Sequence, residues 1–234
     1  MISIIIPTLN EEGALPPLLE AIGRQRAAHE VIVVDGGSQD RTLEAARGLR
    51  VRSLVSPPGR GAGIIVGAQA AHGDVLLFLH ADSTLADGAL DRINEALSSN
   101  PKIVGGNFRL VFEGDTRFGR WLTRFCGWIR LLGFYYGDSG IFVRRSVYEV
   151  LGGFRPLPVM EDWDFVRHLE RFGRTCCIED PPILTSSRRF AGRHPLKIVC
   201  GWVKIHVLFW LGVSPDRLAR SYRTQAPPPA HPVV

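Results

Sequence analysis

Acidic, basic and imidazole side chains gather at four places in the first hundred residues, close after short apolar runs. These places are residues 7–12, 35–40, 59–61 and 80–82, with the sequences PTLNEE, DGGSQD, GRG and HAD. Carboxylates bind hard divalent cations such as Mg²⁺ and Mn²⁺, which also hold phosphates. Arginine binds phosphate bidentately, and glycine lets the backbone approach a ligand. These residue types favour an anionic ligand.

The first two clusters allow two interpretations each. Asp35 can accept a hydrogen bond from a base or a ribose, with Gly37 admitting the ligand. The alternative is a tight strand–helix turn in which Ser38 or Asp40 caps the next helix. Asn10 and Glu11 likewise suit a ligand site or an N-cap with an acidic first turn. Without further information, the capping interpretation is favoured.

His80 and Asp82 form a sharper pair. The period-two alternation at the end of a strand points both side chains the same way, which suits a divalent cation. The alternative is a buried polar pair that caps the following turn.

The glycine-rich segment 59–63 lacks the GxGxxG spacing and follows two prolines, which disfavours a Rossmann cofactor site. Either a flexible loop brings Arg60 near a phosphate or a base, or the segment is a plain surface loop.

A block of carboxylates, Glu161, Asp162 and Asp164, stands at the start of a predicted helix. Acids there compensate the helix dipole, an effect of roughly 0.3–1 kcal/mol. The functional alternative is a general base whose pKa is set by the neighbouring carboxylates and by partial burial. Spacing alone does not separate the two.

Alternating strands and helices must position these side chains. We expect strands buried on both faces at residues 2–6, 31–34, 51–55 and 75–79, with helices at 15–26, 42–49 and 62–71. This order predicts a parallel sheet with ligands at the carboxyl ends of its strands.

The pattern changes near residue 100. We expect strands at 104–112, 141–143, 175–178 and 183–186, and helices at 118–132, from 146, from about 161 to 171, and at 196–211. Residues 225–234 hold four prolines and are expected to be disordered.

Composition bounds the class of protein. The 234 residues are 45% hydrophobic and 22% charged, which suits one large domain or two small ones and excludes a fibrous or disordered chain. No apolar run reaches the roughly 18–20 residues of a membrane span. The first residues do not resemble a signal peptide, and the four cysteines lack CxxC spacing. We therefore expect reduced thiols and a cytosolic location.

The two parts of the chain differ in charge. Residues 1–100 hold 8 basic and 12 acidic residues, whereas residues 101–234 hold 20 and 11. Of the 28 basic residues 25 are arginine, which suits an anionic ligand or reflects a GC-rich genome.

Six motifs follow one another in a recognisable order. They are PTLNE at 7–11, VVDGGSQD at 33–40, FLHADS at 78–83, GDSGIFV at 137–143, LGGF at 151–154 and MED at 160–162. Over roughly residues 2–190 the chain resembles family 2 glycosyltransferases of the GT-A fold, and among them the compact bacterial members with FLHAD in place of FLDAD.

The resemblance implies an α/β fold with a mostly parallel central sheet flanked by helices, and a C-terminal helical extension. It implies inverting transfer of a sugar from a nucleoside-diphosphate sugar, with UDP favoured over GDP, assisted by Mn²⁺ or Mg²⁺. Asp82 matches the second acid of the DxD motif, and Asp162, beside Glu161, matches the catalytic base. The implied donor-binding residues are Pro7, Thr8, Asn10, Glu11, Asp35, Gly37, Arg60, His80, Ala81, Asp82, Arg188 and Arg189.

Two departures from the family pattern matter. Gly36 stands where a second acid is common, which weakens any inference about the base of the nucleotide. His80 replaces the first DxD acid, so it is expected to bind the metal or the ribose, or to donate to phosphate when protonated.

Two helices suggest a membrane surface. On a helical wheel of residues 118–132, Trp121 and Trp128 share a face with Phe125, Ile129 and Leu132, flanked by three arginines, Arg117, Arg120 and Arg124. Such a helix suits an anionic membrane, although packing against the sheet is the favoured alternative. With the apolar segment 198–213, it suggests a lipid acceptor such as a polyprenyl or carotenoid lipid. The location would then include the inner face of the cell membrane.

We predict a glycosyltransferase domain at 1–190, with a nucleotide and metal half at 1–100 and an acceptor half at 101–190. A helical extension follows at 191–224. The alternative functions are a non-catalytic sugar- or lipid-binding scaffold and a sugar-nucleotide pyrophosphorylase, although the glycine-rich loop that opens the latter is missing. No nucleic-acid partner is expected, because the basic residues are not arrayed with aromatics in a recognisable module.

Overall fold

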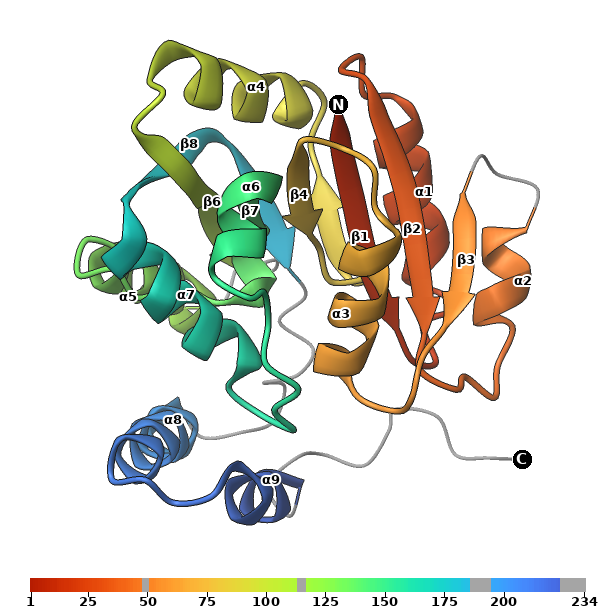
Figure 1. The fold of residues 1–234 in the computed structure, drawn as a ribbon. Helices are drawn as coiled ribbons and strands as arrows, with labels where there is room; N and C mark the ends of the chain where they lie inside the picture. Colours follow the sequence, from red (N-terminus) through yellow and green to blue (C-terminus); the bar gives the residue numbers. More distant parts are fainter. Residues whose placement is uncertain (48–50, 113–116, 186–194, 224–234) are drawn as a thin grey trace.

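The computed structural model describes residues 1–47, 51–112, 117–185 and 195–223. Within these ranges one sheet of eight strands has the order β3-β2-β1-β4-β7-β6-β8-β5 (Figure 1). The strands are β1 Ile2–Thr8, β2 His29–Asp35, β3 Arg52–Val55, β4 Val75–Phe78, β5 Ser83–Leu85, β6 Ile103–Phe112, β7 Ile141–Arg144 and β8 Arg174–Thr185. The prediction of an α/β fold with a mostly parallel sheet is confirmed.

The first half of the chain forms the parallel part of the sheet. Strands β1 to β4 run parallel and are linked by α1 (Leu15–Gly23), α2 (Thr42–Ala46) and α3 (Arg60–Ala70). The prediction that residues 51–55 are buried on both faces is wrong. Strand β3 lies at the edge of the sheet, where Val55 is 69% exposed.

The second half mixes strand directions. Strand β7 is antiparallel to both β4 and β6, β8 is parallel to β6, and β5 is antiparallel to β8. The prediction of two strands at 175–178 and 183–186 is wrong, because β8 is continuous. Its polar middle segment, Glu179 to Pro182, stays extended, and the pairing register with β6 shifts between Phe108 and Leu110.

The remaining helices surround this half. They are α4 (Ala89–Ser99), α5 (Arg117–Arg130), α6 (Arg145–Val150), α7 (Glu161–Phe172), α8 (Pro195–Trp210) and α9 (Pro215–Arg223), with a short 3₁₀ helix at Gly137–Ser139. Strand β5, α4 and α9 have no counterpart in the predicted elements. The signal for α4 is present in its sequence, since Leu90, Ile93 and Leu97 recur at helical spacing and are buried.

The core lies on both faces of the sheet. Ile2, Ile4 and Ile6 of β1 belong to a cluster with α1 and α4, whereas Ile5 faces a second cluster with α3 and α7. This division follows from the alternation of side chains along a strand.

Glycines bring α3 against the sheet. A Cβ atom on Gly67 would lie 2.4 Å from Ile5 Cγ2, and one on Gly63 would lie 3.0 Å from Pro7 Cβ. Helix α3 already begins at Arg60. The prediction of a flexible loop or a plain surface loop at residues 59–63 is therefore wrong. The close packing fixes Arg60 at the carboxyl end of β1.

The face of α5 that packs inward differs from the prediction. Gly119 and Leu122 are buried, with Phe125 half-buried, whereas Trp121 and Trp128 are 46% and 60% exposed. The tryptophans share the outer face with Arg117, Arg120 and Arg124, so packing of the tryptophan face against the sheet is wrong.

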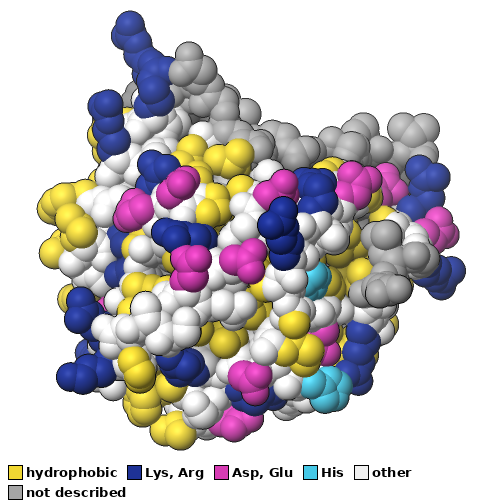
Figure 2. Space-filling view, turned by 90° about the horizontal axis from the view of Figure 1, so that it is seen from above, with side chains coloured by type: hydrophobic (Ala, Val, Ile, Leu, Met, Phe, Trp, Pro, Cys, Tyr) yellow, Lys and Arg dark blue, Asp and Glu magenta, His cyan; other side chains and the backbone are white. Residues whose placement is uncertain are grey.

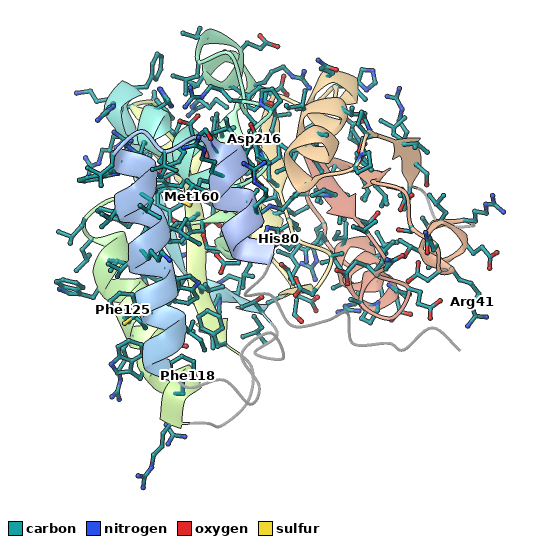
Figure 3. All side chains as sticks on the ribbon, turned by 90° about the horizontal axis from the view of Figure 1, so that it is seen from below. Arg41, His80, Phe118, Phe125, Met160 and Asp216 are labelled. Carbon is teal, nitrogen blue, oxygen red and sulfur yellow. The ribbon has the colours of Figure 1, made fainter. Side chains whose placement is uncertain are left out.

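Helices α8 and α9 lie at the end of the molecule where β1 to β3 end (Figure 1). Figure 3 looks at this end from below, with the two helices in front and Arg41 far to one side. Among the described helices, none combines the length and apolar character needed to cross a bilayer.

Candidate active site

Arg60 connects three segments that are distant in the sequence. Its Nε donates to Glu161 Oε1 at 2.5 Å and its Nη2 donates to Asp162 Oδ2 at 3.2 Å. Its Nη1 lies 3.1 Å from His80 Nε2. The start of α3, the exit of β4 and the start of α7 therefore meet at one guanidinium group at the carboxyl edge of the sheet.

The start of α7 is shaped to hold Asp162 in this place. Met160, which precedes the helix, has a positive φ of 64°. The Asp162 side chain is buried, with Oδ2 accepting from Gly137 N at 3.0 Å and Oδ1 from Trp163 N at 2.8 Å. A Cβ at residue 137 would lie 2.8 Å from His80 Nε2 and 3.4 Å from Asp162 Oδ2, so a larger residue there would have to displace the His80 ring.

The charges around Asp162 keep it ionised. Burial acts to raise the pKa of Asp162, but the charge of Arg60 and the N–H groups of Gly137 and Trp163 outweigh it and leave the pKa below its usual range. Conversely, burial acts to lower the pKa of Arg60, and the nearby charges of Asp162 and Glu161 raise it overall. This arrangement is a buried carboxylate held in its basic form.

His80 takes part as a hydrogen-bond acceptor. Arginine carries only donors, so the contact between Arg60 Nη1 and His80 Nε2 requires an unprotonated Nε2. The neutral ring then carries its proton on Nδ1.

The acidic block at the start of α7 divides into separate tasks. Asp164 is buried and forms a two-pronged ion pair with Arg155, whose Nε lies 2.6 Å from Asp164 Oδ2. Glu161 and Asp162 face Arg60 instead. Asp164 therefore anchors the segment before α7, and the other two acids belong to the site.

The exit loops of β1 and β2 are joined by hydrogen bonds. Asn10 Oδ1 accepts from Gln39 N at 2.8 Å, Asn10 N donates to Ser38 Oγ at 2.9 Å, and Glu11 N donates to Thr42 Oγ1 at 2.7 Å. Asn10 has a positive φ of 55°. These contacts make the two predicted clusters one structural unit.

Asp35 is also engaged within its own loop. Its buried carboxylate accepts from Gly37 N and Ser38 N, both at 3.0 Å, and from Ser38 Oγ at 2.5 Å. Of the two predicted capping residues, Asp40 meets the start of α2, where its Oδ1 accepts from Thr42 N at 3.0 Å, whereas Ser38 bonds to Asp35 instead. At the rim of this loop Gly37 adopts a φ of 102°, a conformation that favours glycine.

The other predicted donor residues differ in their proximity to Arg60. Pro7 lines a narrow pocket with Arg60, His80, Gly137 and Asp162. The Thr8 hydroxyl is buried and donates to Val34 O at 3.4 Å. Arg188 and Arg189, predicted to meet the diphosphate, lie outside the described residues.

The predicted metal ligands fit a divalent cation in part. Ala81 is buried and Asp82 is half-buried in the segment between β4 and β5. Across the described part of the chain, three or more acidic, His or Cys side chains do not come together to hold a metal. Mg²⁺ needs only one or two carboxylates when phosphates supply other ligands, so Asp82 fits that role. A cation on His80 Nε2 would face the positive charge of Arg60.

Two site residues were missing from the predicted set. Gly137 contacts Asp162 directly, and Tyr136, beside it, has its hydroxyl 2.8 Å from His206 Nε2 on α8. The sequence feature that could have indicated them is the GDSG segment at 137–140, in which two polar residues lie between two glycines and outside the predicted elements. Spacing alone did not reveal that it folds back onto the start of α7.

Comparison with known sequences places this chain among glycosyltransferases. The model of "Glycosyl transferase family 2" matches residues 3–151. A PGL/p-HBAD biosynthesis glycosyltransferase of Mycobacterium bovis is 30% identical over 204 residues, which cover 79% of this chain and 72% of that protein. An undecaprenyl-phosphate 4-deoxy-4-formamido-L-arabinose transferase of Pseudomonas paraeruginosa is 28% identical over 72% of this chain and 55% of that protein.

Solved structures share the fold. TarS of S. aureus superposes with a TM-score of 0.64 at 17% identity, covering 88% of this chain but 39% of that one. TarS has also been solved in complex with UDP-GlcNAc. The mannosyltransferase PcManGT of Pyrobaculum calidifontis, in complex with GDP-Man and Mn²⁺, has a TM-score of 0.63 at 19% identity over 87% of this chain and 61% of that one. This chain therefore spans only part of these structures.

Proposed function

The chain belongs to glycosyl transferase family 2, and we propose that it transfers a sugar, with inversion, from a nucleoside-diphosphate sugar to the hydroxyl group of an acceptor. The fold is that of the GT-A glycosyltransferases. Residues 1–190 would form the catalytic domain, with residues 191–224 as its helical extension.

The arrangement of Arg60, Glu161, Asp162 and His80 carries this proposal. It puts a buried, ionised carboxylate next to a guanidinium group at the carboxyl ends of parallel strands, where ligands of such sheets bind. Transfer of a glycosyl group needs both functions, a base for the acceptor hydroxyl and positive charge for the departing diphosphate.

In the proposed reaction Asp162 takes the proton of the acceptor hydroxyl. The acceptor oxygen forms a bond to the anomeric carbon as the bond from that carbon to the diphosphate oxygen breaks, and the diphosphate leaves with the electron pair. Attack from the face opposite the leaving group inverts the anomeric centre. Before this step Arg60 would bind the diphosphate of the donor, and its departure from Asp162 would raise the pKa of that carboxylate and make it a stronger base.

A divalent cation is part of the proposal through Asp82. When bound, it would neutralise charge on the diphosphate. Asp82 would supply a carboxylate ligand. His80 contacts Arg60, so it would act on the donor indirectly by holding Arg60. The bound Mn²⁺ of the archaeal mannosyltransferase supports the use of a cation by this fold.

We further propose a lipid acceptor reached from the surface of a membrane. The name of one sequence relative, from Pseudomonas paraeruginosa, contains undecaprenyl phosphate, which is a lipid-linked phosphate. The segments 117–136 and 181–215, which include α5 and α8, contain no acidic residue. By contrast, the face of the molecule seen in Figure 2 intersperses acidic and basic side chains. Peripheral contact at the inner face of the cell membrane would follow from this charge distribution.

Binding of the donor tests the proposal first. The thermal midpoint should rise by about 5–10 °C with a nucleoside diphosphate at a hundredfold excess over Kd. We expect a larger shift with UDP than with GDP, and a smaller one after EDTA treatment. An unchanged midpoint with every nucleoside diphosphate would contradict the proposal, and donor binding without turnover would favour the non-catalytic scaffold.

A further inference from the structure

A groove of about 790 Å³ lies next to the proposed active site, between α7, the end of α8 and the segment that follows α5. We call it the α7–α8 groove. It is lined by residues 131–134, by Trp163, Arg167, Glu170 and Arg171 of α7, and by Phe209 and Trp210 of α8. Its volume falls in the range of sites for small organic ligands, roughly 300–1,000 Å³.

One wall of the groove is aromatic. The ring of Trp163 stacks on Phe134 at a centroid distance of 4.7 Å and an angle of 19°, and Phe209 lies on the α8 side. The indole Nε1 of Trp163 is buried without a hydrogen-bond partner among the described residues. This wall suits an apolar chain, and the indole adds one unsatisfied donor.

Positive charge lies further along α7 in the same groove. Arg167 and Arg171 are one helical turn apart on α7, and neither forms an ion pair with a carboxylate in the described part of the chain. Arg167 lies 5.8 Å from the centre of the Trp210 ring. Glu170 is already engaged, since its Oε1 lies 3.6 Å from Arg130 Nη1 and accepts from Thr175 Oγ1 at 2.5 Å. The groove therefore offers two arginines to an anion.

The groove adjoins the catalytic carboxylate along two segments. Trp163 directly follows Asp162 on α7, and Phe134 lies three residues before Gly137, which donates to Asp162. Helix α8 is tied to the same segment, because Tyr136 contacts His206. The Trp202 carbonyl accepts from His206 Nδ1 at 2.7 Å, which leaves Nε2 to accept from the Tyr136 hydroxyl in the neutral ring.

Large apolar side chains surround the opening. Leu131, Leu132 and Trp210 line the groove yet are 84%, 60% and 65% exposed. An apolar opening of this kind marks a surface that meets a lipid or an apolar partner. A ligand that entered here would place its chain on apolar side chains and its charge on arginine.

We propose that the α7–α8 groove binds an anionic amphiphile, with its apolar chain along the Phe134–Trp163 wall and its anionic group at Arg167 and Arg171. The identification of this amphiphile as the sugar acceptor rests on the proposed function. The binding itself does not depend on it.

Isothermal titration calorimetry measures the affinity of the groove for dodecyl phosphate, dodecanol and inorganic phosphate. Dodecyl phosphate is kept below its critical micelle concentration. Dodecyl phosphate should bind at least tenfold more tightly than dodecanol or inorganic phosphate. Arg167→Gln with Arg171→Gln should weaken its binding at least tenfold. The control pair Arg26→Gln with Arg47→Gln removes the same charge from exposed positions outside the groove and should leave the affinity unchanged.

Equal affinity for dodecyl phosphate and dodecanol would overturn the proposal, as would an unchanged affinity in the Arg167/Arg171 variant. Adsorption to exposed tryptophan is tested with Trp128→Ser, since Trp128 does not line the groove. A loss of binding in this variant alone would also overturn the proposal. Asp162→Asn should bind dodecyl phosphate normally, so the groove and the proposed reaction can fail independently.

Discussion

At the scale of single residues, the site depends on one guanidinium group shared by two acids and an imidazole. The Arg60 side chain is 36% exposed, whereas Glu161 and Asp162 are 3% and 10% exposed. Arg60 thus reaches from the solvent boundary to two buried charges. Removing Arg60 would leave two buried carboxylates without a cation. The free energy cost of these unpaired charges exceeds the stabilisation that the ion pairs themselves contribute.

Replacing Arg60 should therefore destabilise the fold. We expect Arg60→Ala to lower the free energy of unfolding by roughly 2–3 kcal/mol, below the 3–5 kcal/mol of fully buried pairs because Arg60 is partly exposed. Urea unfolding measures this change. Adding Asp162→Asn to Arg60→Ala should recover part of the loss, and strictly additive losses would argue against a coupled pair.

The depressed pKa of Asp162 predicts how stability depends on pH. A carboxyl with a lower pKa in the folded state stabilises the protein above its unfolded value, near 3.8, and this contribution is lost as pH falls through the folded value. The difference in unfolding free energy between the parent and Asp162→Asn should be constant near neutral pH and shrink below pH 3.8. A difference that stays constant down to about pH 2.5 would contradict the lowered pKa.

At the scale of elements, close packing of α3 positions Arg60. Residue 67 has no space for a side chain, because a Cβ atom there would lie 2.4 Å from Ile5 Cγ2 and 3.1 Å from Val34 Cγ2. The glycines of this segment are therefore needed for the contact between helix and sheet. The sequence predicts a helix over 62–71, which includes Gly67, but a loop at 59–63, because helix propensity disfavours glycine and gives no information on what the helix must approach.

Gly67→Ala should lower the free energy of unfolding by about 1–3 kcal/mol through overpacking. Gly23→Ala is the matched control, since a Cβ on residue 23 at the end of α1 meets nothing within 4 Å. The control should be neutral or slightly stabilising. Chemical denaturation measures the free energy of unfolding of both variants. Equal stabilities would contradict the conclusion that close packing of α3 requires glycine at residue 67.

Helix α5 illustrates the limit of helical patterning. The sequence predicts an amphipathic helix, and the helix is present at Arg117–Arg130. A wheel groups residues by hydrophobicity, but the fit of side chains to the neighbouring strands decides which face is buried. Small and branched side chains, Gly119 and Leu122, fit against the sheet, and the larger Trp121 and Trp128 remain outside.

The exposed face of α5 predicts binding to anionic vesicles. Each arginine near such a surface contributes about 1 kcal/mol, so Arg120→Gln with Arg124→Gln should weaken partitioning by roughly tenfold or more. Sedimentation with phosphatidylglycerol vesicles at low salt measures this effect, with phosphatidylcholine vesicles as the neutral comparison. Equal partitioning of parent and variant would contradict a role of α5 in membrane binding.

At the scale of the whole molecule, the first half was more predictable than the second. Buried parallel strands read as continuous apolar runs, and β1, β2 and β4 lie where those runs predict them. Strands β5 and β8 depend on pairing between distant segments, which local patterns do not encode. The same holds for the site: Asp162, His80 and Arg60 were predicted as separate candidates, but their meeting at one point required the folded chain.

The change of charge along the chain corresponds to this division. The mildly acidic first hundred residues supply the loops proposed to bind the donor, together with Asp82 and the strand ends. The arginine-rich remainder supplies α7, the α7–α8 groove and the exposed face of α5. Under the proposed function, the basic charge of the second part accompanies the surfaces that face lipid, whereas Arg60, which would bind the diphosphate, belongs to the first part.

The most direct test of the central claim compares the parent with Asp162→Asn, using hydrolysis of a bound UDP-sugar as the basal reaction. Proton NMR identifies the anomer that is released first, and calorimetry measures donor affinity. We predict that the parent releases the inverted anomer, and that Asp162→Asn binds the donor within about threefold of the parent but turns it over at least a hundredfold more slowly. Unchanged turnover in Asp162→Asn, or release of the retained anomer by the parent, would contradict the role of Asp162 as the base of an inverting transfer.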